Sequence, residues 1–558
     1  MRLNAPTCVA VSGLCILILG FLCSSLIFPK LENHLIAKET ALEEGSKAFK
    51  SWKKIPFPFK FKIYFFNVTN PDEVQDGSNP VLKELGPYIY EYVEFRKREI
   101  LSTNEENDTI TYIQRKIYYF NQEESGCRSQ DDIVTILNFG IVSTAHKVNE
   151  IAPSVLSMVN DGLPFLYPGI KNAFTTNSVR NILFDGLPMS CESEVVDMIC
   201  QGLRSKMPPT VRAAENNRDY LVSLFHHVGT IIILFVRANL RFQINGSDDG
   251  PYEIARGFKS TTKGKMVSFK NKTALSEWGG DYCNKIRGTD LTVNPNLLTI
   301  PKRIHFFASD FCRSFSAGFN KKMEYLGLHT YKFTANDIFR SDEDCFCASE
   351  ADDDSDLPSC PPAGTMHTGP CTESHIIISQ PHFLNAEKSL LTYAKGLKPN
   401  KDKHGTYIIM EPKTGLALVV KTRFQMNIFL QRFDAVDLLR NVSEGLFPFI
   451  WLEEGAVVPL PIVEEIRNNF SKLKIFDILK YIMIISGIVL LGVSLILAMI
   501  KDNIFCVCAN HNVGKNVVSV SELEPREKFA DLYPHLKMKN VTLVNNKTVD
   551  RQAWKILE

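Results

Sequence analysis

Residues 54–70 read KIPFPFKFKIYFFNVTN, and residues 82–92 read LKELGPYIYEY. In both stretches, aromatic and β-branched runs are broken by proline, glycine or Asn-Pro, which is typical of strands joined by turns. Similar runs follow along the chain at 109–120, 229–245, 305–308, 325–333, 375–379 and 406–433. This succession of short strands, with few long helical patterns, predicts a large antiparallel sheet or barrel.

One interval, from about residue 133 to residue 207, has a different pattern. Its apolar residues recur at three- and four-residue spacing, as in SVLSMVNDGLPFL and SEVVDMICQGL. This period predicts a cluster of helices inserted into the β framework. Lys171 lies between apolar neighbours in the same interval. It is a candidate for attracting a carboxylate head group at a ligand entrance, and an ordinary surface lysine is the alternative.

Two uncharged apolar stretches lie near the ends of the chain. Residues 8–28 read CVAVSGLCILILGFLCSSLIF, and residues 481–500 read YIMIISGIVLLGVSLILAMI. As helices, both are long enough to cross a hydrocarbon core of about 30 Å. We therefore predict two transmembrane helices, the first of which is expected to end at Pro29 and Lys30. For this first stretch a cleaved signal peptide is the alternative, but the stretch exceeds the roughly 7–15 apolar residues of a signal core.

The segment between the two spans carries the marks of an extracytoplasmic compartment. Most of the 14 cysteines lie in it, which is expected where disulfides form. It also contains Asn-x-Ser/Thr glycosylation acceptors at Asn67, Asn107, Asn245, Asn271, Asn441 and Asn469. Because two spans place both termini on one side of the membrane, short cytosolic ends are predicted.

Composition and motifs argue against several classes of function. The 63 Lys+Arg balance 62 Asp+Glu, whereas nucleic-acid-binding proteins are usually basic. The sequence lacks a Gly-x-Ser-x-Gly elbow, a His-Glu-x-x-His helix, a Walker loop and a dinucleotide fingerprint. Cys345-Phe-Cys347, with His367 and His375 nearby, lacks the paired spacing of a zinc site. We therefore predict that the chain is not an enzyme and uses no metal or other cofactor.

Several longer strings of residues resemble the class B scavenger receptor family. They occur in the family's order between the two apolar spans: KIYFFNVTNPDEV, ELGPYIYEY, CNKIRGTD (283–290), FFASDFCRS (306–314), CFC (345–347), QPHF (380–383) and YIIMEPKTG (407–415). The string LFDGLPMSCESEVVDMIC (183–200) is most similar to the insect sensory neuron membrane protein branch. The resemblance covers nearly the whole chain.

This resemblance implies an α+β membrane protein. Its extracellular part would be an antiparallel β-barrel with an apolar tunnel and a distal helical-bundle cap, anchored by two terminal transmembrane helices. The expected organisation is a cytosolic N-terminus (1–7), a span (8–28), an extracellular ligand-binding domain (29–480) with the cap at about 133–207 and a disulfide-rich region at 283–371, a second span (481–500) and a cytosolic tail (501–558).

The resemblance also implies a disulfide framework, which sequence alone leaves open among fifteen pairings. The expected bonds are Cys283–Cys345, Cys312–Cys371 and Cys347–Cys360. Cys191 and Cys200 are close enough in sequence to form a further bond if a turn separates them, and a buried pair of thiols is the alternative. Cys127 is then left over, either as a thiol or in an intermolecular bond.

The tail carries candidate modification and sorting signals. Cys506 and Cys508 follow the second span, where the resemblance supports S-acylation, and it supports acylation of Cys8 more weakly. Unmodified thiols are the alternative. Tyr533-Pro-His-Leu536 fits a tyrosine-based endocytic sorting signal, although such short patterns are common by chance.

The function implied by the resemblance is that of a plasma-membrane receptor that binds and transfers hydrophobic molecules unreacted. An apolar lumen holds such ligands because burial stabilises each CH₂ by about 0.8 kcal/mol. Fatty acids, fatty-acyl-derived pheromones and lipoproteins are the expected ligands, and an odorant receptor complex or a ligand-carrier protein is the expected partner. We favour pheromone or odorant detection in sensory neurons or their support cells. The alternatives are a scavenger receptor for fatty acids and lipoproteins, and a sorting receptor for a lysosomal enzyme.

Overall fold

The computed structural model describes residues 5–501, apart from 93–96, 206–210, 226–247, 259–261, 298, 340–345, 347–359 and 373. The predicted strand at 229–245 lies outside the described residues. The chain divides into two compact units, Met1–Leu14 with Gly487–Glu558 and Cys15–Ser486. We describe each unit by itself.

Strand β1 (Phe59–Val68) lies within the large sheet of the second unit. Its burial alternates along the strand, and Phe61, Ile63 and Phe65 are buried. It pairs antiparallel with β2 (Leu82–Tyr92) on one side and with β20 (Gly445–Val457) on the other. The two stretches that suggested strands and turns are therefore neighbouring strands, and the alternation of their side chains places one face in the core.

The large sheet has eleven strands and is antiparallel throughout its named pairings. Its order is β13 (Arg303–Ala308), β14 (Arg313–Tyr325), β15 (Leu328–Thr334), β18 (Tyr407–Met410), β19 (Ala417–Leu430), β20, β1, β2 and β5 (Tyr119–Phe120), while β16 (Thr365–His367) and β17 (Ile376–Ser379) join it through β19. Within the described residues no pairing joins β13 to β5. A closed barrel therefore stays a prediction.

Three smaller sheets accompany the large one. They contain β12 (Met266–Phe269), β11 (Asp248–Ala255), β4 (Thr109–Arg115) and β3 (Lys97–Asn104) in one sheet, β6 (Ile133–Leu137) and β7 (Phe174–Ser178) in another, and β8 (Leu187–Met189), β10 (Tyr220–Val222) and β9 (Val211–Ala213) in the third. Short helices connect these strands: α4 (Pro71–Gln75), α5 (Gln122–Ser125), α9 (Asp281–Asn284), α10 (Gly369–Thr372), α11 (Leu390–Tyr393) and α12 (Lys401–His404).

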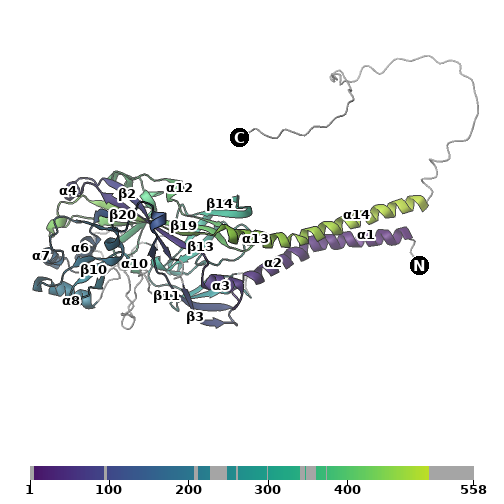
Figure 1. Ribbon diagram of the computed structural model, residues 1–558, viewed down its shortest axis with the longest axis horizontal. Coiled ribbons are helices and arrows are strands. Elements are labelled where there is room, and N and C mark those ends of the chain that lie inside the picture. Colours follow the sequence, from purple (N-terminus) through teal and green to yellow (C-terminus); the bar gives the residue numbers. More distant parts are fainter. Residues whose placement is uncertain are drawn as a thin grey trace, which may run out of the picture. The chain divides into compact units, whose positions relative to one another are not determined.

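The interval 133–207 contains the predicted helices, together with strands that its sequence did not suggest. The helices are α6 (Phe139–Ile151), α7 (Leu156–Leu166) and α8 (Asp197–Ser205). Strands β6, β7 and β8 lie in the same interval. β6 pairs with β7, and α6 and α7 lie between these two strands in the sequence. Figure 1 shows α6, α7 and α8 at the end of this unit that is remote from α13 (Leu460–Leu473). The helical interpretation was therefore incomplete, because the run at 133–137 is too short for its period to separate strand from helix.

Two long apolar helical segments include the predicted spans. They cover Ala5–Thr40 and Leu460–Lys501, and both are long and apolar enough to cross a membrane. The first consists of α1 (Ala5–Leu22), a π-helical turn (Cys23–Ile27) and α2 (Phe28–Thr40), and the second of α13 and α14 (Ile475–Lys501). Large apolar side chains stay exposed along both, such as Phe21 at 68% and Leu495 at 59%. A lipid environment accounts for this exposure.

The expectation that Pro29 ends the first helix is wrong. Helix α2 continues from the π-helical turn, in which the N–H of Phe28 donates to the carbonyl of Cys23, five residues earlier. Proline lacks the N–H that an uninterrupted α-helix would use, and a local widening of the hydrogen-bond pattern tolerates that loss. The helix therefore runs on to Thr40.

The two long segments contact each other within each unit. In the first unit, Ser494 Oγ donates to the carbonyl of Pro6 at 2.8 Å. In the second unit, the rings of Phe28 and Phe476 lie 5.6 Å apart. At Gly20, an added Cβ would lie 3.1 Å from the Cβ of Met483. Small residues thus let the helices approach closely, as is common between membrane helices.

Candidate functional site

A cavity of about 910 Å³ lies within the unit 15–486. Helices α2, α3 (Lys47–Lys53) and α13 form one part of its wall, and strands β13, β14, β19 and β20 form another. Most of the exposed wall is apolar, and Ile36, Phe306, Phe424 and Ile466 contribute to it. Ligand sites in proteins usually have volumes of about 300–1,000 Å³. The cavity is therefore large enough for an elongated apolar molecule.

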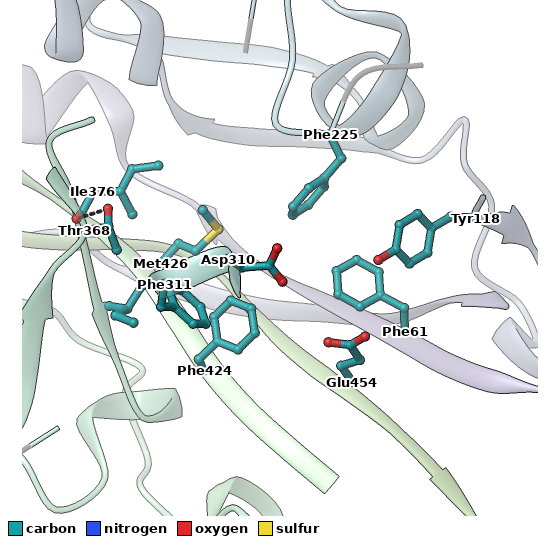
Figure 2. Close-up of a pocket in the computed structure, with 11 residues that line it drawn as sticks. Phe61, Tyr118, Phe225, Asp310, Phe311, Thr368, Ile376, Phe424, Met426 and Glu454 are labelled. Carbon is teal, nitrogen blue, oxygen red and sulfur yellow. Dashed lines mark hydrogen bonds between the residues drawn. The ribbon is translucent and has the colours of Figure 1, made fainter. Parts of the chain in front are cut away.

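A second, much smaller cavity of about 40 Å³ adjoins the first. Asp310, Phe311, Phe424 and Glu454 line both cavities. Figure 2 shows these side chains around the smaller cavity, together with further lining residues from several elements, among them Phe61, Tyr118, Phe225, Ile376 and Met426.

Aromatic rings stand where the two cavities adjoin. The rings of Phe311 and Phe424 meet edge to face at 5.2 Å, and those of Phe61 and Phe225 meet in the same way at 5.6 Å. Such edge-to-face contacts are favourable, because the positive edge of one ring meets the negative face of the other. Phe311 and Phe424 line both cavities, and we call these two residues the aromatic constriction.

Two of the buried cations in the cavity wall are paired with carboxylates. Lys116 Nζ lies 3.1 Å from Glu454 Oε1, and Arg423 Nε donates to Glu453 Oε2 at 2.7 Å. Burial disfavours the charged form of Glu453, but Arg423 and the nearby lysines outweigh this effect and hold its pKa below the usual value. These two ion pairs place charged groups in a wall that is otherwise mostly apolar.

Lys263 is a third buried cation in the wall, and only 6% of its surface is exposed. Its Nζ donates to Thr40 Oγ1 at 2.7 Å and to the carbonyl of Thr414 at 3.1 Å. Burial lowers the pKa of Lys263 to about 8, and the charge of Glu411 acts in the opposite direction. Nothing in the local sequence around Lys263 distinguished it from a surface lysine.

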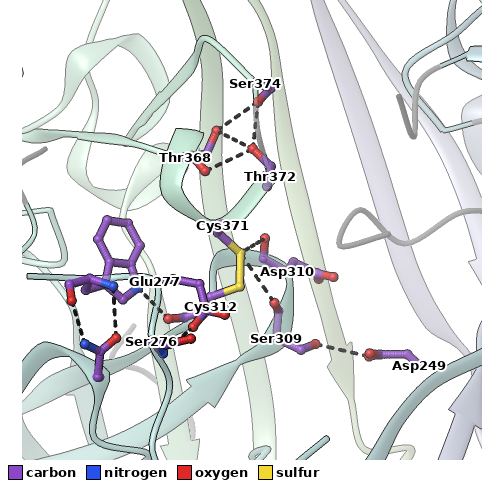
Figure 3. Close-up of a disulfide and its surroundings, with 12 residues drawn as sticks. Asp249, Ser276, Glu277, Ser309, Asp310, Cys312, Thr368, Cys371, Thr372 and Ser374 are labelled. Atoms are coloured by element: carbon purple, nitrogen blue, oxygen red, sulfur yellow. Dashed lines mark hydrogen bonds between the residues drawn. A yellow bond between two sulfur atoms is a disulfide. The ribbon is translucent and has the colours of Figure 1, made fainter. Parts of the chain in front are cut away.

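A disulfide between Cys312 and Cys371 braces the wall beside the constriction (Figure 3). Cys312 directly follows the short helical turn Ser309–Phe311, which lines the large cavity. Trp278 Nε1 donates to the carbonyl of Cys312 at 2.6 Å. The Oγ of Ser309 donates to Asp249 Oδ2 at 3.1 Å. The bond and these contacts fix the backbone that carries Phe311.

The other cysteines can be compared with the expected framework. Cys191 and Cys200 form the disulfide that was left open against a thiol pair, with 6.1 Å between their Cα atoms. Cys283 and Cys360 are also disulfide-bonded. Their expected partners, Cys345 and Cys347, lie outside the described residues. Cys127 is an exposed thiol.

Lys171 does not line either cavity, and its side chain is exposed in the connection between α7 and β7. The alternative interpretation of Lys171 as a surface lysine fits this placement. An entrance role for Lys171 stays a prediction.

The glycosylation acceptors differ in accessibility. Asn107, Asn271, Asn441 and Asn469 are exposed, whereas Asn245 lies outside the described residues. Asn67 is half-buried, and its Oδ1 accepts a hydrogen bond from the Thr135 backbone N–H at 2.8 Å. A glycan would be attached to Nδ2, so this contact through Oδ1 is compatible with glycosylation of Asn67. The tail residues Cys506, Cys508, Tyr533 and Leu536 also lie outside the described residues, and Cys8 lies in α1.

Glu84, His382 and His404 form a cluster with metal-ligand chemistry that the sequence did not suggest. The backbone N–H groups of Lys398 and Asn400 donate to Nδ1 of His382 and His404, both at 3.0 Å. In the neutral rings the proton therefore sits on Nε2, and His382 Nε2 donates it to Glu84 Oε2 at 2.6 Å. Metal binding at Nε2 would break this arrangement. The cluster is better described as a hydrogen-bonded brace.

The fold and the cavity define a protein with two candidate membrane helices and a β domain that contributes to the wall of a largely apolar cavity. The CD36 family model matches residues 11–498. The chain therefore belongs to the CD36 family, the class B scavenger receptors, whose members are receptors rather than enzymes. This confirms the family predicted from the sequence.

The curated relatives are insect proteins. The chain is 33% identical to "Sensory neuron membrane protein 2" of Heliothis virescens over 86% of this chain and 90% of the relative. It is 33% identical to the protein of the same name from Manduca sexta, over 85% and 90%. It is 32% identical to "Sensory neuron membrane protein 1" of Heliothis virescens, over 83% and 85%. These relatives agree with the predicted branch.

Proposed function

We propose that this protein is a sensory receptor at the plasma membrane that binds apolar molecules, such as fatty-acyl-derived pheromones, in its large cavity and passes them on unreacted. The observation that carries the proposal is an apolar cavity of about 910 Å³ in the β domain. The names of the curated relatives support the sensory setting. An odorant receptor complex or a ligand-carrier protein is the proposed partner.

In this proposal the large sheet closes into a barrel, and the two cavities join to form a tunnel. The shared residues Asp310, Phe311, Phe424 and Glu454 support such a connection. Ligand would pass when the aromatic constriction opens, and α6, α7 and α8 would form the distal cap. Each buried CH₂ of the ligand would contribute about 0.8 kcal/mol, which requires no covalent step.

The proposed topology places 29–480 outside the cell and both termini in the cytosol. Exposed glycosylation acceptors and the disulfides Cys191–Cys200 and Cys312–Cys371 support this orientation, because both modifications belong to the secretory route. S-acylation of Cys506 and Cys508 and a sorting role for Tyr533 and Leu536 belong to the same proposal.

A cavity-filling substitution tests ligand binding. Val420 on β19 lines the cavity, whereas Val457 on β20 is 48% exposed and does not line it. We expect Val420→Trp to weaken binding of a fluorescent fatty-acyl probe by about tenfold or more, because the indole occupies ligand space. Val457→Trp is the matched control and should bind normally. Unchanged binding by Val420→Trp would contradict the proposal.

Two further candidates share the same cavity. A scavenger receptor for fatty acids or lipoproteins would be found in gut or fat tissue rather than in olfactory cilia, so antibody localisation separates the two settings. A sorting receptor for a lysosomal enzyme is less favoured, because the tail sequence 501–558 contains no clear acidic dileucine signal. Recovery of chemically altered ligand after incubation would count against a pure binding role.

A further inference from the structure

Lys263 differs from the other buried cations of the cavity wall. Lys116 and Arg423 each lie next to a carboxylate, at 3.1 and 2.7 Å. Lys263 has no carboxylate within ion-pair distance among the described residues, although it is as deeply buried. The charge of Glu411 acts on Lys263 without an ion pair between them. A buried charge without a counter-ion in contact is costly, so its presence in a ligand-sized cavity calls for an explanation.

Two glycines between β11 and β12 allow close packing around Lys263. Gly257 and Gly264 flank it with positive φ angles of +81° and +75°. A Cβ at Gly257 would lie 2.3 Å from the Cβ of Lys263, and a Cβ at Gly264 would lie 2.0 Å from the carbonyl oxygen of Val293. Such close backbone approach requires glycine. The side chain of Lys263 is therefore packed directly against the backbone of Gly257, and the next residue, Gly264, is packed against Val293.

Within the part of the chain that the structure describes, the ammonium group of Lys263 has one more N–H donor than its contacts use. Lysine carries three N–H donors, and two of them point to Thr40 and Thr414. Thr40 ends α2, and both threonines line the same cavity. Among the described residues the third donor has no acceptor, and no carboxylate is in contact with the ammonium group, which suits an anion that enters from the cavity.

We propose that Lys263 binds the carboxylate head group of a single-chain apolar ligand in the large cavity. The hydrocarbon chain then lies against the apolar wall, toward Phe311 and Phe424. This inference rests on the proposed function, because it needs a ligand in the cavity. It adds a selectivity for the ligand: a carboxylate supplies a counter-charge in direct contact with the ammonium group, whereas a neutral ester or alcohol supplies only an acceptor.

The test compares a fatty acid with its neutral ester. Radiolabelled hexadecanoic acid and methyl hexadecanoate are bound to the full chain held in amphipols at pH 7. We expect the acid to bind about tenfold or more tightly than the ester. Lys263→Met should lower the affinity for the acid by about tenfold or more and abolish the preference for the acid over the ester. Lys263→Arg should keep the preference for the acid.

The matched control is Lys265→Met, which removes an exposed lysine two residues away and should bind both ligands normally. Equal binding of acid and ester by the unchanged protein would overturn the role of Lys263 and leave the proposed function standing. A preference that survives in Lys263→Met would also overturn it. If neither ligand binds, the proposed function itself fails. Should Lys263→Met not fold, Lys263→Gln, which keeps donors for both threonines, takes its place.

Discussion

Arg98 shows how a single buried charge is satisfied in this fold. The residue is fully buried, and its Nη2 donates to Asp290 Oδ2 at 3.0 Å and to Thr292 Oγ1 at 2.9 Å. Its guanidinium group also lies over the rings of Trp52 and Tyr112, at 4.7 and 5.2 Å. These contacts join β3 to α3 and to the CNKIRGTD segment. The ion pair with Asp290 and the cation–π contacts with the two rings together stabilise the buried guanidinium group.

Substitution of Arg98 by Met should therefore be strongly destabilising. It leaves the Asp290 carboxylate largely buried without its cation, which typically costs about 3–5 kcal/mol. Arg115→Met is the matched control, because the Arg115–Asp248 pair is about half exposed and should contribute at most about 1 kcal/mol. Denaturant unfolding of the full chain in detergent measures both. Similar losses for the two variants would contradict the argument.

His404 makes stability depend on pH. Burial, reinforced by the neighbouring His382, lowers the pKa of His404 to about 4 from the usual 6.5. Its Nδ1 accepts the Asn400 N–H, so protonation there would also break a hydrogen bond. Between about pH 6.5 and pH 4 the unfolded chain binds a proton that the folded chain does not, and stability is lost as pH falls through this window.

The variant His404→Asn should flatten this dependence, because the amide oxygen can still accept from Asn400 while no group titrates. The free energy of unfolding, measured from pH 7 to pH 5, should fall less in the variant than in the unchanged protein. His329→Asn removes an exposed histidine of β15 and serves as the control. An unaltered slope in His404→Asn would show that other groups cause the loss.

At the scale of elements, the two described disulfides tie different kinds of structure. Cys191–Cys200 closes a short loop, with a sequence separation of 9, between β8 and α8. Cys312–Cys371 closes a separation of 59 and joins the segment before β14 to α10. The longer loop restricts the unfolded chain more, so the second bond should stabilise the fold more.

Replacing each pair by alanine tests this order. The chain-entropy account gives losses of about 2.5 kcal/mol for Cys191→Ala with Cys200→Ala and about 4 kcal/mol for Cys312→Ala with Cys371→Ala. The second double variant should also reduce binding of the fatty-acyl probe, because the bond braces Phe311 beside the cavity. The free energy of unfolding and the affinity for the probe, measured for both double variants, test these expectations. A larger loss for the first pair would contradict the loop-length argument.

At the scale of the whole molecule, the exposed glycosylation acceptors report the membrane orientation. When the chain is expressed in insect cells, glycosidase treatment should raise its electrophoretic mobility. Asn107→Gln, Asn271→Gln and Asn441→Gln should each remove one step of this shift. A chain without any shift would place 29–480 on the cytosolic side and contradict the proposed topology.

Local sequence patterns were sufficient for many of the elements. Alternating aromatic residues predicted β1 and β2, and uncharged apolar runs predicted the helices that include 8–28 and 481–500. These features depend on what each segment buries, which its own residues largely determine. Where segments were short, as at β6 and β7, the pattern was ambiguous and neighbouring strands decided the outcome.

The sequence by itself determined the membrane helices, the strand-rich domain, the cysteines available for bonding and the family. Tertiary structure alone decided the cavity and its chemistry. Its wall draws on residues from Leu35 to Leu473, and Lys263 became notable only when folding buried it beside Thr40 and Thr414. Periodicity reports whether a side chain is covered. It does not show which segments, distant in the sequence, pack around that side chain. A ligand site forms only where such segments come together.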